Sequence, residues 1–371
     1  MNARRTLDPG EQIAWLRLAR TETIGPATFA ALLARFSDVR EACDAAPRLA
    51  RRGGARALQM PDEAAIKSEL EKLAKLRGRM LGFIEPDFPP GLAALDPPPP
   101  VISVIGDPAL LKREMVGVVG ARNASGLGIK LAAMISGDLG RAGLAVVSGL
   151  ARGIDHSAHV AALETGTVAV LAGGIDIVYP PEHRELYDQI SRRGAVISEM
   201  PLGMAPLPRH FPRRNRLISG LARGVVVIEA AERSGSLITA NYAAEQGREV
   251  FAVPGSPLDP RAKGANRLIR EGAILTESAD DVLNALSPVL KHGFREQVAR
   301  ETAIQPFDAA LEDEADSVRS AVQEKIGASP VEVDELIRQT GAPAEAVATV
   351  LLEMELAGMV RRHPGNLVSW R

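Results

Sequence analysis

The 371-residue sequence lacks three features that would assign it to a special class: cysteine pairs, a long apolar run and an excess of charge. A single cysteine, Cys43, excludes a disulfide framework or a thiolate metal cluster, and we expect it to be a small, half-buried apolar residue. No run approaches the ~18 apolar residues of a membrane helix. Residues 1–10 lack the apolar core of a signal peptide, so we expect a cytoplasmic protein with no membrane partner.

The charge balance constrains any polyanionic partner. The formal net charge is -2, so a nucleic-acid site has to be a local cluster of Lys and Arg on a balanced background. Hydrophobic residues make up 46% and charged residues 24%, which is typical of globular protein, and the length suggests two or three domains.

The N-terminal region, from Glu11 to about Lys75, is helical in pattern and rich in Ala, Leu and Arg. It contains a Gly25-Pro26 turn that leads into an amphipathic helix. This pattern is that of a helix-hairpin-helix, whose turn amides can hold a DNA phosphate, or of a small helical bundle that uses Gly-Pro as a helix start. Proline-rich segments at 87–90 and 96–100 then form a stiff connection.

The central region alternates short, nearly continuous apolar runs with helical stretches such as Ile129–Ala142 and Leu237–Gln246. Runs of this kind indicate strands that are buried on both faces, and the alternation predicts a doubly wound, mostly parallel α/β sheet of the Rossmann-like type. The expected strands are Val101–Ile105, Met115–Val119, Leu144–Ser148, Val168–Leu171, Ala195–Ser198, Val225–Glu229 and Glu249–Val253. We place the domains at 1–80, 81–286 and 316–371, with a linker at 287–315.

The C-terminal region is typical of a winged helix: three helices, Val318–Ile326, Val331–Gln339 and Ala344–Ala357, precede a hairpin at Met359–Trp370. The third helix would be the recognition helix, yet it carries glutamates and no Lys or Arg. An acidic helix repels the phosphate backbone. We therefore expect this module to contact protein, or to modulate access to the main site, rather than to read a major groove.

The unusual local sequences of the central region all follow expected strands, where open parallel sheets bind ligands. The first is a glycine-rich loop before a helix, a phosphate-cradling arrangement with one arginine, formed by Gly120, Ala121, Arg122 and Ser125. Its spacing matches neither a Walker loop nor a dinucleotide fingerprint, which argues against ATP hydrolysis, NAD or another cofactor. The alternative is that these glycines serve only tight turns.

The second loop, at 148–155, contributes Gly149 and Arg152, and we expect Asp155 to cap the following helix. His156 and His159 are expected to be partly exposed helix residues, with acid–base catalysis by Asp155 and His156 as the alternative. The two histidines, three positions apart, could also share a metal, but no nearby carboxylate or thiolate completes a ligand set.

The third segment is the required basic cluster, whose arginines could neutralise phosphates while its phenylalanine stacks on a base for roughly 1–3 kcal/mol. It consists of Arg209, Phe211, Arg213, Arg214, Asn215 and Arg216. The alternative puts the phenylalanine in the core and pairs some arginines with acidic neighbours.

Two further loops offer a second anion-binding surface, at Ser234, Gly235 and Ser236, and a cation, Lys263; Asn266 belongs to the same surface or is only a helix cap. We find no nucleophile set and no nuclease-like carboxylate cluster, so no catalytic residue and no metal are assigned. Glu199 and Glu229 end strands and are expected to be ion-pair partners.

Five blocks in this order resemble the DNA-processing (DprA/Smf) family: Val118-Val-Gly-Ala-Arg122, Ser148-Gly-Leu-Ala-Arg-Gly-Ile-Asp155, Phe211-Pro-Arg-Arg-Asn-Arg216, Ser234-Gly-Ser-Leu-Ile-Thr-Ala240 and Gly247-Arg-Glu-Val-Phe-Ala-Val-Pro-Gly255. The flanks resemble the family's SAM-like and winged-helix extensions. The resemblance implies a Rossmann-like fold, a homodimer, sequence-independent binding of single-stranded DNA and recruitment of the recombinase RecA in natural transformation. It implies a DNA pocket at Gly120-Ala-Arg122 and around Phe211, and no established catalytic activity.

Two other functions remain open at this point. A phosphoribohydrolase acting on nucleoside monophosphates would use Glu199 or Glu229 at the sugar. A transcription regulator would act through the winged helix, and the acidic third helix counts against it.

Overall fold

The computed structural model of the chain describes residues 4–36, 38–290, 309–363 and 365–371, and most of the expected linker lies outside them. The chain divides into two units. One comprises Met1–Ser68, Asp96–Pro100 and Val298–Arg371, and the other comprises Glu69–Leu95 and Val101–Gln297. The division falls within helix α4 (Glu63–Lys75). In the described part of the chain, no helix combines the length and the apolar character that crossing a membrane requires.

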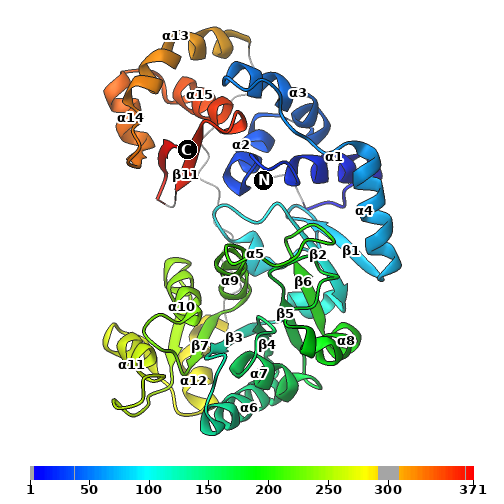
Figure 1. The fold of residues 1–371 in the computed structure, drawn as a ribbon, viewed down its shortest axis with the longest axis vertical. Coiled ribbons are helices and arrows are strands. Elements are labelled where there is room, and N and C mark those ends of the chain that lie inside the picture. Colours follow the sequence, from blue (N-terminus) through cyan, green and yellow to red (C-terminus); the bar gives the residue numbers. More distant parts are fainter. Residues whose placement is uncertain (1–3, 37, 291–308, 364) are drawn as a thin grey trace. The chain divides into compact units, whose positions relative to one another are not determined.

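The second unit is built on a nine-stranded sheet in the order β1-β2-β6-β5-β4-β3-β7-β8-β9 (Figure 1). Strands β1 and β2 pair antiparallel with each other, β2 pairs antiparallel with β6, and every other pairing is parallel. The strands are β1 (Gly78–Gly82), β2 (Val101–Gly106), β3 (Met115–Gly120), β4 (Ala145–Ser148), β5 (Thr167–Val170), β6 (Ala195–Ser198), β7 (Gly224–Ile228), β8 (Glu249–Ala252) and β9 (Ile274–Leu275).

The expected mostly parallel α/β sheet is therefore confirmed, and each expected strand is present. Two edge strands were missed. β1 contains two glycines and β9 has two residues, so neither shows the apolar run that marks a buried strand.

Helices cover both faces because side chains alternate across each strand. Val116 and Val118 of β3 face one core, which is closed by α6 (Gly126–Arg141), α7 (Ile154–Ala162) and α12 (Ala279–Leu290). Met115 and Val119 face the other core, which is closed by α9 (His210–Leu221), α10 (Gly235–Glu245) and α11 (Lys263–Arg270). The short α5 (Pro90–Ala93) contacts α9, and α8 (Arg184–Arg193) contacts β2, β5 and β6.

The order of the strands locates a switch point. From β3 the chain proceeds outward through β4, β5 and β6, then returns to form β7 on the other side of β3. In open α/β sheets, ligands bind beyond the carboxyl ends of the strands at such a point. The loops that follow β3 and β7 lie there, and those that follow the parallel strands β4, β5, β6 and β8 open onto the same edge.

The first unit joins the N-terminal helices to a winged helix. Its N-terminal helices are α1 (Pro9–Ala19), α2 (Pro26–Arg35) and α3 (Val39–Arg52). After the sheet domain the unit continues with helices α13 (Ala309–Lys325), α14 (Val333–Thr340) and α15 (Ala344–Leu356) and strands β10 (Val331–Glu332), β11 (Val360–His363) and β12 (Leu367–Trp370). The winged-helix prediction is confirmed. The second helix was expected to begin at Val331, but residues Val331 and Glu332 form β10, because they pair with β12 in a three-stranded sheet.

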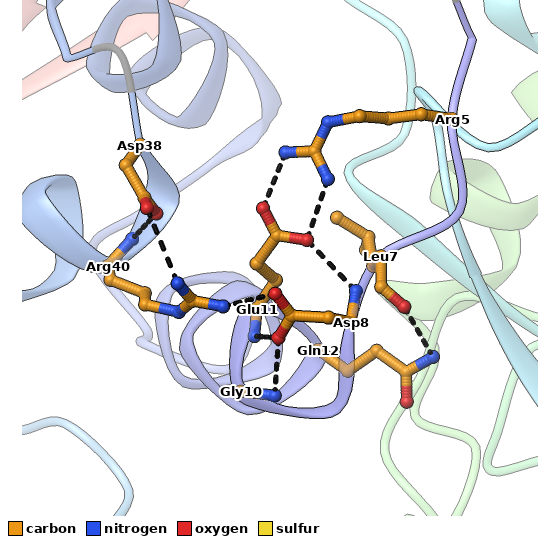
Figure 2. Close-up of polar contacts among 8 residues, drawn as sticks. All are labelled: Arg5, Leu7, Asp8, Gly10, Glu11, Gln12, Asp38 and Arg40. Carbon is orange, nitrogen blue, oxygen red and sulfur yellow. Dashed lines mark hydrogen bonds and ion pairs between the residues drawn. The ribbon is translucent and has the colours of Figure 1, made fainter.

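The first helix shows how charged residues organise the N-terminal domain (Figure 2). Asp8 accepts hydrogen bonds from the amides of Gly10 and Glu11, and the Glu11 carboxylate accepts one from the amide of Asp8. Arg40 pairs with Asp8 and with Asp38, which caps α3. The starts of α1 and α3 are thereby linked. α2 begins at Pro26 after Gly25, as the Gly-Pro pattern predicted.

Candidate nucleic-acid interface

The predicted loops come together at the carboxyl edge of the sheet. The loop after β3 meets the loop after β4, where the amide of Ile154 donates to the carbonyl of Ala121 at 3.3 Å. α9 meets the start of α10, where Nδ2 of Asn215 donates to the carbonyl of Gly235 at 3.1 Å. The start of α11 meets the loop after β7, where the amide of Gly264 donates to the carbonyl of Ala230 at 2.7 Å.

Arg214 is the internal brace of this edge. Its guanidinium is buried and donates to the carbonyls of Gly149 and Val170, while Nε donates to Oδ1 of Asn215 at 3.2 Å. A Cβ on Gly149 would overlap this guanidinium, so only glycine fits there. Burial lowers the pKa of Arg214 to about 10, against the attraction of Asp155. Arg214 was expected to contact a phosphate, but its guanidinium is buried and its Nη1 and Nε bond inside the fold, so it braces this edge instead.

Glu199 pairs with two of the remaining arginines of the basic segment. Its buried carboxylate accepts from Nε of Arg213 at 3.2 Å and pairs with Nη2 of Arg216. Burial by itself would raise the pKa of Glu199, but the two arginines outweigh it and hold this pKa below its usual range. The expectation that Glu199 is an ion-pair partner is confirmed. Arg216 is mostly covered, while the side chain of Arg213 stays 49% exposed and Arg209 is exposed at the start of α9.

An aromatic pair lies beside the exposed cations. The guanidinium carbon of Arg122 lies 5.1 Å from the ring centre of Phe211, and the ring of Tyr179 approaches Phe211 edge-on, with 5.8 Å between centres. Phe211 is half-buried, and Tyr179 is 47% exposed. Sequence reasoning missed Tyr179. A Tyr-Pro pair in the loop after a parallel strand, on the same edge as the glycine loop, is the signal that could have found it.

The glycine loop differs from the expected phosphate cradle at its helix end. Ser125 caps α6 by accepting from the amide of Gly128 at 3.0 Å. Its own amide donates to the Glu229 carboxylate at 2.8 Å, and its hydroxyl donates to the same carboxylate. A carboxylate thus lies at the helix start where a phosphate was expected. Glu229 was expected to be an ion-pair partner. Its carboxylate instead accepts hydrogen bonds from the amide and the hydroxyl of Ser125.

The loop after β4 is held from within. Asp155 was expected to cap α7, but it accepts from the amides of Gly149 and Ala151, which precede the helix. Burial raises the pKa of Asp155. His159 was expected to be partly exposed, but it is buried: Nε2 accepts from the amide of Leu150 at 3.3 Å, and Nδ1 bonds Oγ1 of Thr167. Burial lowers the pKa of His159 to about 3, so the ring stays neutral.

The remaining predicted site residues are Arg152, Ser234, Gly235, Ser236 and Lys263. Arg152 is exposed and pairs with Glu182. Ser234 caps α10 through the amide of Ser236 at 3.4 Å, and Gly235 between them is exposed. Lys263 is exposed at the first position of α11.

Asn266 joins a loop rather than capping a helix. Its side chain bonds both the amide and the carbonyl of Gly255, at 3.1 and 2.8 Å. Among the residues that the structure describes, no group of three or more His, Cys, Asp or Glu side chains is placed to hold a metal.

Comparison with family models matches three consecutive parts of the chain. The model described as DNA recombination-mediator protein A matches residues 79–287. The model described as DprA-like N-terminal HHH domain matches residues 9–71, and the DprA winged helix domain matches residues 305–366.

Individual proteins are similar over much of this length. Protein Smf of Escherichia coli (strain K12) is 39% identical over 294 residues, which cover 76% of this chain and 75% of that protein. Protein Smf of Synechocystis is 32% identical over 394 aligned positions, covering 96% and 98%.

Two solved structures are similar as well. The X-ray structure of DNA processing protein A from Streptococcus pneumoniae matches with a TM-score of 0.64 and 34% identity, covering 75% of this chain and 98% of that one. A structure of DNA processing protein A from Helicobacter pylori, described by its single-stranded DNA binding mode, matches with a TM-score of 0.52 and 25% identity, covering 58% of this chain and 96% of that one.

Proposed function

The chain belongs to the DNA recombination-mediator protein A (DprA/Smf) family, and we propose that it binds single-stranded DNA without sequence preference at the carboxyl edge of its sheet. The observation that carries the proposal is the group of Arg122, Phe211 and Tyr179, which offers a cation and exposed ring surface side by side. Sequence-tolerant binding of single strands needs these two elements, because every nucleotide has a phosphate and a stackable face.

The predicted site residues fall into two roles under this proposal. Five exposed cations bind the strand, Arg122, Arg152, Arg209, Arg213 and Lys263, together with the rings of half-buried Phe211 and exposed Tyr179. The others shape the loops that present them: Gly120, Ala121, Ser125, Gly149, Arg214, Asn215, Arg216, Ser234, Gly235 and Ser236. A rigid support matters because loops that are ordered before binding lose less entropy when they bind.

The single-stranded DNA binding described for the Helicobacter pylori protein supports the same ligand class here. From family membership we further propose a cytoplasmic homodimer that passes the strand to RecA during natural transformation. Two interfaces on one dimer would bind a longer strand more tightly by raising the effective concentration of the second contact.

The hydrolase alternative depends on Glu199 or Glu229. Glu199 bonds two arginines, and Glu229 bonds the amide and hydroxyl of Ser125. Neither arrangement favours a carboxylate that attacks a sugar, so we do not propose a hydrolase function.

Fluorescence anisotropy with labelled single-stranded and duplex oligonucleotides, across a salt series, tests the proposal. We expect salt-sensitive preference for the single strand, with the logarithm of affinity falling by about 0.7 per phosphate contact per tenfold increase in salt. Arg122→Ala should lose affinity for all sequences and lower the salt slope. Arg141→Ala is the matched control. Arg141 is a 70% exposed arginine in the last turn of α6, and the glycine loop with Arg122 lies before the first turn of the same helix. Equal affinity of the Arg122 variant and the control at low salt would contradict the site, and absent preference for single strands would contradict the function.

A further inference from the structure

The third helix of the winged helix, α15, is covered along most of its length. Most of its buried residues are apolar: Ala346, Val347, Val350, Leu351, Leu352, Met354 and Leu356. Three polar or charged residues, Thr349, Glu353 and Glu355, are buried as well. Helices α2 and α3 of the N-terminal domain contact α15 within the same unit (Figure 1). A helix that reads a major groove has to present an exposed face to the DNA. In this unit the N-terminal helices contact α15 instead.

Buried polar contacts make this interface specific. Nη1 of Arg35 donates to Oγ1 of Thr349 at 2.9 Å, and the hydroxyl of Thr28 donates to Oε2 of Glu355 at 3.0 Å. Both contacts are buried and join segments more than 300 positions apart in the sequence. Burial of a polar group is costly unless it is hydrogen-bonded, so these side chains favour one arrangement of the two domains over others.

An ion-pair network crosses the same interface. The side chain of Glu353 is fully buried; it bonds Nε of Arg52 at 2.9 Å and also pairs with Arg319. Arg52 reaches Asp316 as well, at 3.0 Å. A buried carboxylate requires compensating charge, and here one arginine comes from the N-terminal domain and the other from α13. The two buried glutamates of α15, Glu353 and Glu355, therefore have partners inside the unit.

The backbones of the two domains also touch. Gly53 ends α3 with φ -71 and ψ -4, a conformation open to any residue. A Cβ at this position would nevertheless overlap the carbonyl of Glu353, so glycine serves the close approach of α3 to α15 and not a special backbone angle.

Several arginines of the winged helix are paired with its own glutamates. Arg362 of the hairpin pairs with Glu355 at 2.5 Å, Arg319 pairs with Glu353, and Arg338 pairs with Glu335. Binding of a duplex depends on cations that are available to neutralise phosphates.

We propose that α15 is a docking helix whose partner is the N-terminal helical domain of the same chain. In this role the winged helix fastens the two ends of the chain into one folded unit and does not read duplex DNA. Glu353, whose charge is unsuited to phosphates, is what Arg52 of the N-terminal domain recognises on this helix.

Hydrogen exchange on the full-length protein tests this contact with a matched pair of glycine variants. Gly53→Ala places a methyl group against the backbone of Glu353, whereas Gly25→Ala places one in open space in the same unit. We expect exchange of the α15 amides to accelerate at least tenfold in Gly53→Ala and to stay near wild type in Gly25→Ala. Unchanged exchange of α15 in Gly53→Ala would overturn the proposal.

Milder variants address the case in which Gly53→Ala unfolds the whole unit. Arg52→Ala, Glu353→Gln and the double variant form a cycle in which the effects on α15 exchange should be non-additive, because the two side chains bond each other. Additive effects would contradict the contact. Protection of α15 that disappears on dilution would identify a second chain as the partner, and protection of α15 by added duplex DNA would show a DNA-reading helix; either result overturns the proposal.

Discussion

Replacing Arg214 with methionine removes a buried guanidinium while leaving an unbranched stem of similar length. The carbonyls of Gly149 and Val170 then lose a charged donor in a dry environment. A buried acceptor left unsatisfied costs about 1–3 kcal/mol, so the two together predict a loss of roughly 2–6 kcal/mol in the free energy of unfolding. Asp155 also loses its nearby positive charge, which adds to the loss.

The adjacent residue should behave in the opposite way. The side chain of Arg213 is 49% exposed and shares Glu199 with Arg216, which remains in place when Arg213 is replaced. Because Arg216 still compensates the buried Glu199 carboxylate and the Arg213 side chain is half-exposed, the loss should be about 1 kcal/mol, so Arg213→Met should unfold near the wild-type midpoint. Its exposed cation, however, faces the proposed strand, and affinity for single-stranded DNA should fall with a reduced salt slope.

Scanning calorimetry separates the two effects. Each kcal/mol shifts the melting temperature of a domain of 150–250 residues by about 2–4 °C, so Arg214→Met should melt roughly 4–24 °C lower. Tryptophan fluorescence is unsuitable, because Trp15 and Trp370 both belong to the other unit. Arg214→Lys, which keeps the charge with fewer donors, is the control and should fall between. A fully stable Arg214→Met that has lost DNA affinity would refute the assignment of Arg214 as a brace.

Two further predictions concern the ring and the buried histidine. Tyr179→Ala should weaken single-strand binding by roughly 1–3 kcal/mol, at least fivefold, while Tyr179→Phe retains it, as measured by anisotropy; equal affinities for both would contradict a stacking role. The pKa of His159 is about 3 in the folded chain and its ordinary value is 6.5. The unfolded chain therefore binds a proton first as the pH falls, and stability is lost progressively below pH 6.5, by about 2 kcal/mol at pH 5. Denaturant unfolding at pH 7.5 and 5 should show this loss, and His159→Gln should reduce it; an identical pH dependence in both proteins would contradict it.

Local sequence predicted the elements best where one physical requirement dominates. The Val-rich runs of β3 and β7 are stable only when both faces are covered, so they indicated a parallel sheet directly. Gly25-Pro26 similarly predicted the start of α2. β9 was missed because two residues contain no period, and β10 was read as helix because its pairing with β12 is not local.

The site was predicted as a set of loops but not as a set of roles. The rule that ligands bind beyond the carboxyl ends of parallel strands selected the edge at which these loops meet in the structure, and the Arg-rich segment lies in α9 at this edge. Asp155 and His159 were given surface roles because a helix start and a helix face are usually exposed. Their burial follows from the packing of the loop after β4 against β5, which places Thr167 beside His159.

The sequence by itself determined the doubly wound sheet, the helical and winged-helix ends, and the edge that carries the exposed cations, because these depend on short-range pattern and on the direction of parallel strands. Only the tertiary structure decided which arginine faces outward. Arg214 bonds Gly149, 65 positions away, and Arg213 shares Glu199 with Arg216. It also decided that, in α15, Glu353 pairs with Arg52 and Glu355 pairs with Arg362. Whether a charged side chain is a partner or a free ligand depends on its burial and on residues remote in the chain, and a local pattern contains neither.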